Sequence, residues 1–167
     1  MKQTKAYVGC SGYHYEDWEG KFYPGDVKKE DWLAYYSETF NSVEINNSFY
    51  KLPDKETFSK WKEMTPEHFR FTLKGSRYIT HMKKLKDPKT HVRKFLNAID
   101  PLAGTTDCIL WQLPGNLHLN EDKLDSFCQV LSKDFIHVME FRHASWFTEA
   151  TWEVLSNHEH MAACSLS

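Results

Sequence analysis

The sequence lacks the motifs that assign many chains to a function at sight. It contains no GxGxxG, P-loop, GxSxG or HExxH motif, and no CxxC or Cys/His pair with zinc-ligand spacing. No run approaches the roughly 18 apolar residues of a membrane helix, and no signal-peptide core follows the short polar start. These absences argue against the common nucleotide-binding, covalent-catalytic and membrane classes. They predict a cytoplasmic protein without a membrane association.

A surplus of charge of either sign is also missing. The 21 Lys and Arg residues nearly balance the 23 Asp and Glu residues, which leaves a net charge of −2. This balance excludes a strongly basic nucleic-acid tail and a strongly acidic solvating tail. With 167 residues and 41% hydrophobic residues, the chain is expected to form a single domain, residues 1–167, with a core of ordinary size.

Short β-like runs alternate with segments of helical periodicity. The runs are rich in Val, Ile, Phe and Leu, and they predict strands at 6–11, 42–48, 69–74, 107–113, 136–142 and 161–166. Between them, apolar residues recur at helical spacing. Asn120 is placed as the N-cap of one helix, and another is expected to begin near Thr148. This alternation indicates βαβ units and a parallel sheet.

The spacing of the strands sets how many units fit. Successive strand starts lie on average 31 residues apart, and eight such units would need the roughly 250 residues of a (β/α)8 barrel. The chain has room for five complete units and a sixth strand. It is therefore either an open α/β sheet of five or six strands or a barrel that is cut short.

The alternation of apolar and polar residues within the predicted strands favours the barrel. In the second strand Val43 and Ile45 face one way while Glu44 and Asn46 face the other. An open doubly wound sheet carries helices on both faces, so its strands read apolar throughout. One polar face fits a barrel, whose inner face opens into a polar mouth at the C-terminal ends of the strands.

Ionisable residues recur at those strand ends. Two carboxylates, two cations and two histidines would converge on the mouth as catalytic candidates: Glu44, Lys74, His81, Glu140, Arg142 and His143. Carboxylates beside cations can serve as acid, base or anion clamp. The structural alternative is an ion-paired plug inside the barrel. A mixed metal site of Glu44, His81, Glu140 and His143 has no local motif to support it.

Polar and aromatic residues near the same mouth are the candidates for ligand binding. They are Ser11, Tyr13, Trp18, Asn46, Tyr50, Gln112 and Trp146. Aromatic side chains beside Lys74, Arg77, Lys83 and Lys84 can stack on bases or sugars while the cations hold phosphates. Alternatively, the aromatic side chains cover the barrel top. His158 and His160 form an HxH pair that is expected in a solvated loop at the opposite end.

Five segments together resemble the YecE-like family of bacterial proteins of unknown function. They are YVGCSGYHYEDWEGKFYP, FNSVEINNSFYKLP, FRFTLKGSRYITH, ILWQLP and MEFRHASW, which follow one another from Ala6 to Trp146. The resemblance implies a TIM-barrel-like fold and places the candidate residues at motif positions of the family. It establishes no activity; the barrel's similarity to sugar isomerases and apurinic endonucleases makes a sugar-phosphate or nucleic-acid ligand a reasonable expectation.

The resemblance also implies a departure. Family members continue for about a hundred residues with two further strands, which this chain lacks, and an Asp often ends strand six where this chain has Ser165-Leu166-Ser167. Six parallel strands cannot close at the geometry of an eight-stranded barrel. The edges of the first and sixth strands are therefore expected to invite self-association.

Three functions remain open. The first is an enzyme acting on a phosphate-bearing or sugar- or nucleotide-like ligand at the mouth. The second is a non-catalytic module for nucleic acid or a nucleotide, against which the net charge counts because no broad basic face is evident. The third is an inactive, truncated chain. The sequence names no metal and no cofactor.

Overall fold

A computed structural model describes residues 6–164 and contains one six-stranded sheet. Every neighbouring pair of strands is parallel. The strands are β1 (Gly9–Ser11), β2 (Ser42–Ile45), β3 (Arg70–Lys74), β4 (Thr106–Gln112), β5 (Ile136–Glu140) and β6 (Met161–Cys164). Their spatial order follows the chain from β1 to β6. This order is that of a barrel wall, because a doubly wound sheet reverses its strand order part-way.

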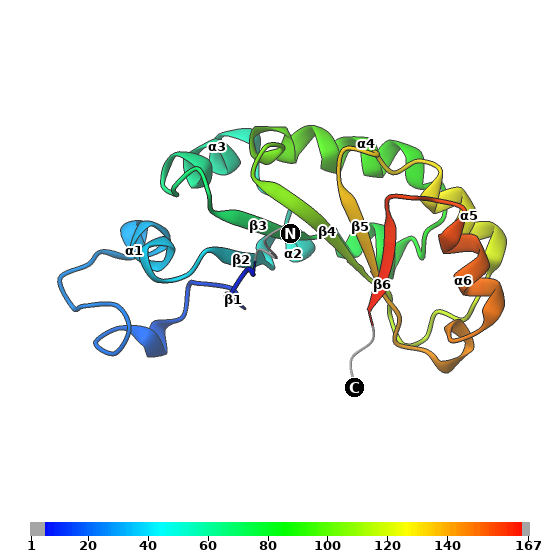
Figure 1. Cartoon of the computed structure of the whole chain (residues 1–167), viewed down its shortest axis with the longest axis horizontal. Coiled ribbons are helices and arrows are strands. Elements are labelled where there is room, and N and C mark those ends of the chain that lie inside the picture. Colours follow the sequence, from blue (N-terminus) through cyan, green and yellow to red (C-terminus); the bar gives the residue numbers. More distant parts are fainter. Residues whose placement is uncertain (1–5, 165–167) are drawn as a thin grey trace, which may run out of the picture.

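The convex side of this curved sheet carries α1 (Trp32–Thr39), α3 (Lys55–Glu63), α4 (Pro88–Ile99), α5 (Glu121–Cys128) and α6 (Glu149–Ser156) (Figure 1). The short α2 (Asn47–Tyr50) follows the carboxyl end of β2. Single turns add η1 (Glu16–Trp18), η2 (Lys29–Asp31), η4 (Asp100–Leu102) and η5 (Ala144–Trp146), and η3 (Tyr78–Met82) is a π-helical turn. The fold is a TIM-barrel-like α/β fold, as the alternation of polar and apolar residues predicted. No helix within residues 6–164 is long and apolar enough to cross a membrane.

The core lies between the sheet and the helices. Outward-facing residues of the strands, such as Val43, Phe71, Ile109 and Met139, are buried there. The inner face carries the partly exposed residues that alternate with them. The predicted N-caps are confirmed, because the Asn120 side chain accepts the Lys123 N–H at 2.9 Å and Thr148 caps α6.

β1, β2 and β5 are each shorter than predicted by two or three residues, the first two for local reasons. Before β1, the amide of Asn41 binds the backbone of Ala6 and Val8, so that stretch pairs with a side chain rather than with β2. After β2, residues 47–50 turn into α2, and the Ser48 hydroxyl donates to the Lys74 carbonyl at 2.7 Å. Residues 165 and 166 of the sixth predicted strand lie outside the described residues.

Buried aromatic and imidazole rings link the carboxyl end of β4 to the amino end of β5 within the core. Trp111 is fully buried, and its Nε1–H donates to Nδ1 of His137 at 2.9 Å. His137 donates from Nε2 to the Ser132 carbonyl, and burial lowers its pKa to about 4. A Cβ on Gly75 would lie 2.1 Å from a Trp111 ring carbon, so the close approach of β3 to this ring requires glycine.

The expectation of a solvated HxH pair is wrong for His160. That residue is 7% exposed, and neither ring nitrogen has a hydrogen-bond partner among the described residues. His158 is tied down as well, because its Nε2 lies 2.9 Å from Oδ1 of Asp125. His158 is thus held against α5, and the His160 ring lies edge-on to the buried His137 ring with the ring centres 5.7 Å apart.

Candidate functional site

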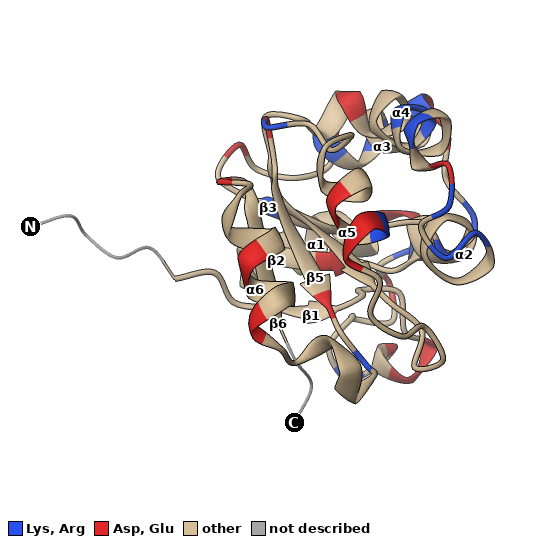
Figure 2. Ribbon diagram, turned by 90° about the vertical axis from the view of Figure 1, so that its right-hand side faces the viewer, with Lys and Arg blue, Asp and Glu red and all other residues tan. Residues whose placement is uncertain are grey.

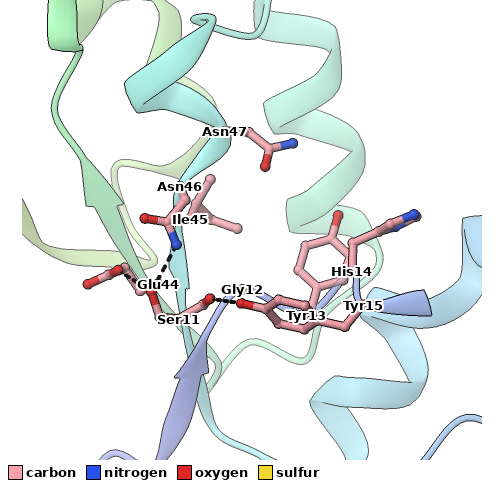
Figure 3. A pocket seen from close by; sticks show the side chains of 9 residues that line it. All are labelled: Ser11, Gly12, Tyr13, His14, Tyr15, Glu44, Ile45, Asn46 and Asn47. Carbon is pink, nitrogen blue, oxygen red and sulfur yellow. Dashed lines mark hydrogen bonds between the residues drawn. The ribbon is translucent and has the colours of Figure 1, made fainter. Parts of the chain in front are cut away.

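The end of β1 and the end of β2 form the first part of the mouth. The Ser11 hydroxyl donates to the Glu44 carboxylate at 2.5 Å, and the Asn46 amide donates to the Ser11 oxygen at 2.9 Å. These groups border a cavity of about 230 Å³ that is also lined by Tyr13 and Tyr15 (Figure 3). The cavity therefore has a hydroxyl, an amide and a carboxylate on one wall and phenol rings on the other.

The end of β5 supplies the second part. The Glu140 carboxylate is 6% exposed and accepts a hydrogen bond from Nε of Arg142 at 2.6 Å, while the Arg142 side chain is 41% exposed. Glu140 is level with the buried Gln112 of β4 in the sheet register. One end of the guanidinium neutralises a buried carboxylate, and the rest of this cation remains available to a ligand.

Lys74 and His81 complete the mouth between these two parts. The Lys74 ammonium lies 5.2 Å from the centre of the Phe49 ring, and the His81 ring packs edge-on to the same ring at 5.1 Å. Nδ1 of His81 lies 2.9 Å from the Thr80 hydroxyl. Phe49 thus fixes a cation and an imidazole on two sides of one buried ring.

The electrostatics show that these groups share one environment. Burial lowers the pKa of His81, and the positive charges of Arg77, Arg142 and Lys74 lower it further, whereas Glu140 acts in the opposite direction. Burial raises the pKa of the Cys164 thiol, and the charges of Glu140 and Glu44 add to the effect. The two carboxylates therefore face the same concave surface, although they come from β2 and β5.

Several predicted site residues lie elsewhere. Trp146 is 1% exposed, stacks on Phe141 and donates from its indole N–H to the Leu117 carbonyl at 2.6 Å. Its ring is not available to stack on a ligand, which corrects the expectation for this residue. His143 stacks on His118 with ring centres 3.9 Å apart, and its Nδ1 accepts the Ser145 N–H. No contact joins His143 to Glu140 or His81 within the described residues.

Of the other aromatic candidates, one lines the cavity and two lie elsewhere. Tyr13 lines the cavity, and burial raises its pKa to about 12. Trp18 is packed among Tyr15, Phe22 and Tyr23, so it anchors the loop rather than lining the cavity. Tyr50 is 69% exposed and lines a different hollow on the outside of the sheet.

Two further neighbours of the mouth were not among the predicted catalytic or ligand-binding residues. Phe49 is a support for Lys74 and His81, and His118 is a stacking partner of His143. Phe49 stands four residues after the end of β2, in the polar and aromatic run that follows this strand, so its position was a usable signal, whereas His118 comes from a loop without a regular pattern. No group of three or more His, Cys, Asp or Glu side chains within residues 6–164 is arranged to hold a metal ion.

The sequence matches the family described as "Protein of unknown function DUF72" over residues 7–166. The chain belongs to this family. It is 32% identical over 126 residues to the UPF0759 protein YecE of Escherichia coli K12, and this alignment covers 75% of this chain and 46% of the relative. It is 25% identical over 155 residues to the UPF0759 protein YunF of Bacillus subtilis, covering 88% of this chain and 54% of the relative.

Solved structures of DUF72 family proteins share the fold of this chain. A DUF72 family protein from Thermotoga maritima superposes with a TM-score of 0.75 at 34% identity, over 91% of this chain and 61% of that one. One from Enterococcus faecalis superposes with a TM-score of 0.74 at 20% identity, over 94% and 59%. The chain spans about half the length of the curated relatives it matches. The YecE-like family predicted from the five segments is confirmed.

Proposed function

We propose that this protein is an enzyme that acts on a phosphate-bearing ligand of the sugar- or nucleotide-like class at the carboxyl ends of the strands. The observation that carries the proposal is the ion pair between the buried Glu140 carboxylate and Arg142. The positive charge of Arg142, like the charges of Lys74 and Arg77, lowers the pKa of His81. A phosphate dianion would be attracted by three cations whose charges act on the same imidazole.

The remaining polar groups fit the sugar part of such a ligand. Ser11, Asn46 and Gln112 present hydroxyl and amide groups on the same face as the two glutamates. Glu44 and Glu140 lie on β2 and β5, and a carboxylate at each side of a ligand can exchange protons with it. His81 has a lowered pKa and enters a neutral-pH reaction as the unprotonated base.

The phosphate site is tested by isothermal titration with inorganic phosphate and with ribose 5-phosphate. The variants Arg142→Ala and Lys74→Ala should each weaken ribose 5-phosphate binding about tenfold, the loss expected for one charge-assisted contact. Lys133→Ala removes an exposed cation before β5 and serves as the matched control. Equal affinities in all three variants would place the ligand elsewhere.

Catalysis needs a separate test. Once a turned-over substrate is found among phosphorylated sugars, Glu140→Gln should abolish turnover, because it removes the ionisable group and keeps the side-chain shape. Circular dichroism of the variant should match that of the unaltered protein. An unchanged rate would remove Glu140 from the mechanism.

A non-catalytic module for nucleic acid or a nucleotide is a second candidate, favoured by the exposed Tyr15 ring beside the same cavity. This function predicts affinity that falls steeply with salt and does not depend on Glu140 as an acid or base. If none of these probes binds, the remaining interpretation is the inactive chain. The cytoplasmic location stays a prediction.

We also propose self-association through the sheet edges. Within residues 6–164, β1 pairs only with β2 and β6 only with β5. Unpaired strand edges are templates for pairing with another chain. Size-exclusion chromatography with light scattering should show a dimer or larger species, and a monodisperse monomer would contradict this proposal.

A further inference from the structure

Positive charge is concentrated in one stretch of the chain. Residues 74–94, here called the basic segment, contain eight Lys and Arg residues and a single acidic residue, Asp87, while the rest of the sequence contains 13 cations and 22 acidic residues. The basic segment therefore carries a charge of +7 in a protein whose net charge is −2. This corrects the expectation that no basic face exists, because the total charge conceals the segregation.

The fold places these cations on one side of the molecule. Figure 2 shows Lys and Arg gathered around α4 and the chain that leads into it, whereas α5 and α6 carry acidic residues. No ion pair joins a cation of the basic segment to a carboxylate within residues 6–164. Unpaired cations at this density attract a polyanion.

Part of the basic segment is the turn between η3 and α4, whose backbone is strained. Lys84, Leu85 and Asp87 all have positive φ angles, of 48°, 62° and 47°. Leu85 is buried and anchors the turn, while Lys83 and Lys86 on either side are exposed. Left-handed residues other than glycine cost free energy and gather where function requires a particular backbone path.

A hollow lies where the residues before α3 meet η3 and α4. Its cavity volume is about 590 Å³, and we call it the outer groove, lined by Leu52, Pro53, Ser76, Tyr78, His91 and Lys94. An adjoining hollow of about 550 Å³ shares Leu52 and Pro53 and adds Tyr50 and Lys51. The two hollows adjoin at Leu52 and Pro53. Ser11 and Glu44 of the mouth line neither of them, although Asn47 borders both the mouth cavity and the second hollow.

Aromatic rings and cations alternate along this surface. The Tyr78 ring is 39% exposed, the His91 ring packs edge-on to it at 4.9 Å, and the Lys83 ammonium lies 5.7 Å from its centre. Tyr50 is 69% exposed next to Lys51. Asp54 also lines both hollows, but its carboxylate is engaged as the N-cap of α3, where it accepts the Thr57 N–H at 2.9 Å.

We propose that the outer groove and the cations that flank it bind a single-stranded nucleic acid. Exposed aromatic rings provide faces on which bases stack, and neighbouring cations track the phosphates, which is the combination that single-strand binding surfaces use. Tyr78 and Tyr50 are the stacking rings, and Lys51, Lys83 and Lys94 are the phosphate contacts. This site does not depend on the function proposed for the mouth.

The test is fluorescence anisotropy with a labelled strand of about twelve thymidines at several salt concentrations. The double variant Lys83→Glu/Lys94→Glu should weaken binding at least tenfold relative to the unaltered protein. It should also reduce the slope of log affinity against log salt by about 1.4, because each phosphate contact on a single strand contributes about 0.7. Phosphate binding at the mouth should be unchanged in this variant.

A matched control separates a local site from net charge. Lys28→Glu/Lys133→Glu makes the same change in net charge at two exposed lysines outside the basic segment, and it should bind the strand almost as the unaltered protein does. Equal losses in the two double variants would overturn the proposal, as would the absence of binding at low salt.

The stacking component has its own control. Tyr78→Ala should weaken binding at least fivefold, the scale of one lost base-stacking contact, and Tyr78→Phe should retain most of it. Poly-glutamate of equal charge and anionic lipid vesicles carry no bases and should compete poorly. Full binding by Tyr78→Ala, or equal competition by either polyanion, would show a general anion surface and overturn the proposal.

Discussion

The two ends of the sheet hold their histidines in opposite ways. At the amino ends of the strands, His137 is fully buried, and both ring nitrogens are hydrogen bonded, to Trp111 and Ser132. At the carboxyl ends, His81 uses only Nδ1 among the described residues, and three cations and one carboxylate act on it.

This difference indicates which end serves stability and which end serves a ligand. A polar group whose partners are all internal has no contact left to offer. A half-exposed imidazole among incompletely paired charges has a position open. Barrels of this type place their active sites at the carboxyl ends of the strands and their stabilising residues at the other end.

Trp111→Ala should give the largest effect and tests the buried contacts that hold His137. The substitution removes a fully buried ring that packs against Phe95, Phe127 and His137, so we expect the free energy of unfolding to fall by about 4 kcal/mol. Urea unfolding monitored by circular dichroism measures it. Lys74→Ala at the mouth should change the free energy of unfolding by less than about 0.5 kcal/mol. Similar losses in the two variants would contradict the difference between buried core and mouth.

The pH dependence of stability should follow His137. Its folded pKa of about 4 lies below the ordinary value of 6.5, so protonation favours the unfolded chain. This contribution is complete above pH 6.5 and is lost as the pH falls toward 4, by about 3 kcal/mol.

The control for this prediction is His137→Gln. A glutamine can accept the Trp111 N–H and donate to the Ser132 carbonyl but does not titrate in this range. Urea unfolding at pH 7, 5.5 and 4.5 should therefore show a flatter dependence in the variant. Parallel curves would assign the acid sensitivity to other groups.

Arg142→Ala should have an intermediate effect and sharpens the comparison at the mouth. It leaves the Glu140 carboxylate, which is 6% exposed, without its cation, so we expect a loss of about 2 kcal/mol in the free energy of unfolding. The double variant Arg142→Ala/Glu140→Gln removes the buried charge and should recover part of that loss. If the double variant is no more stable than the single one, the buried charge is not the cause.

Ser11→Ala should have the smallest effect on stability. Ser11 is exposed, so loss of its hydrogen bond to Glu44 should change the free energy of unfolding by less than about 0.5 kcal/mol. The affinity for ribose 5-phosphate should nevertheless fall about fivefold, the value of one hydrogen bond. Ser126→Ala, an exposed serine of α5, should leave both quantities unchanged. An unchanged affinity in Ser11→Ala would exclude Ser11 from the ligand site.

Much of the fold was predictable because its signals are local. The alternation of polar and apolar residues along β2 and the helix caps at Asn120 and Thr148 depend on neighbouring residues only. These signals predicted the strand and the starts of two helices. The boundaries failed where a distant group intervened, as where the Asn41 side chain takes the hydrogen bonds of the residues before β1. The basic segment is a different case, since a running sum of charge along the chain would have shown it.

The sequence predicted which types of residue form the site and where it lies, but not every residue that takes part in it. Glu44, Glu140, Lys74 and His81 share the carboxyl ends of parallel strands, and a parallel sheet brings such ends to one edge. Trp146 stands just beyond the same edge in sequence, yet η5 turns its ring inward against Phe141. A ring's direction after a strand depends on what it packs against, so position in the sequence does not settle it.

By itself, the sequence determined the strand and helix order, the polar inner face and the family, because periodicity and motif spacing are properties of neighbouring residues. The tertiary structure decided which charges meet, that His137 and His160 are buried, and that Tyr78, His91 and Lys94 border one groove. These outcomes depend on burial and on contacts between segments far apart in the chain. Only packing the helices onto the curved sheet brings those segments together.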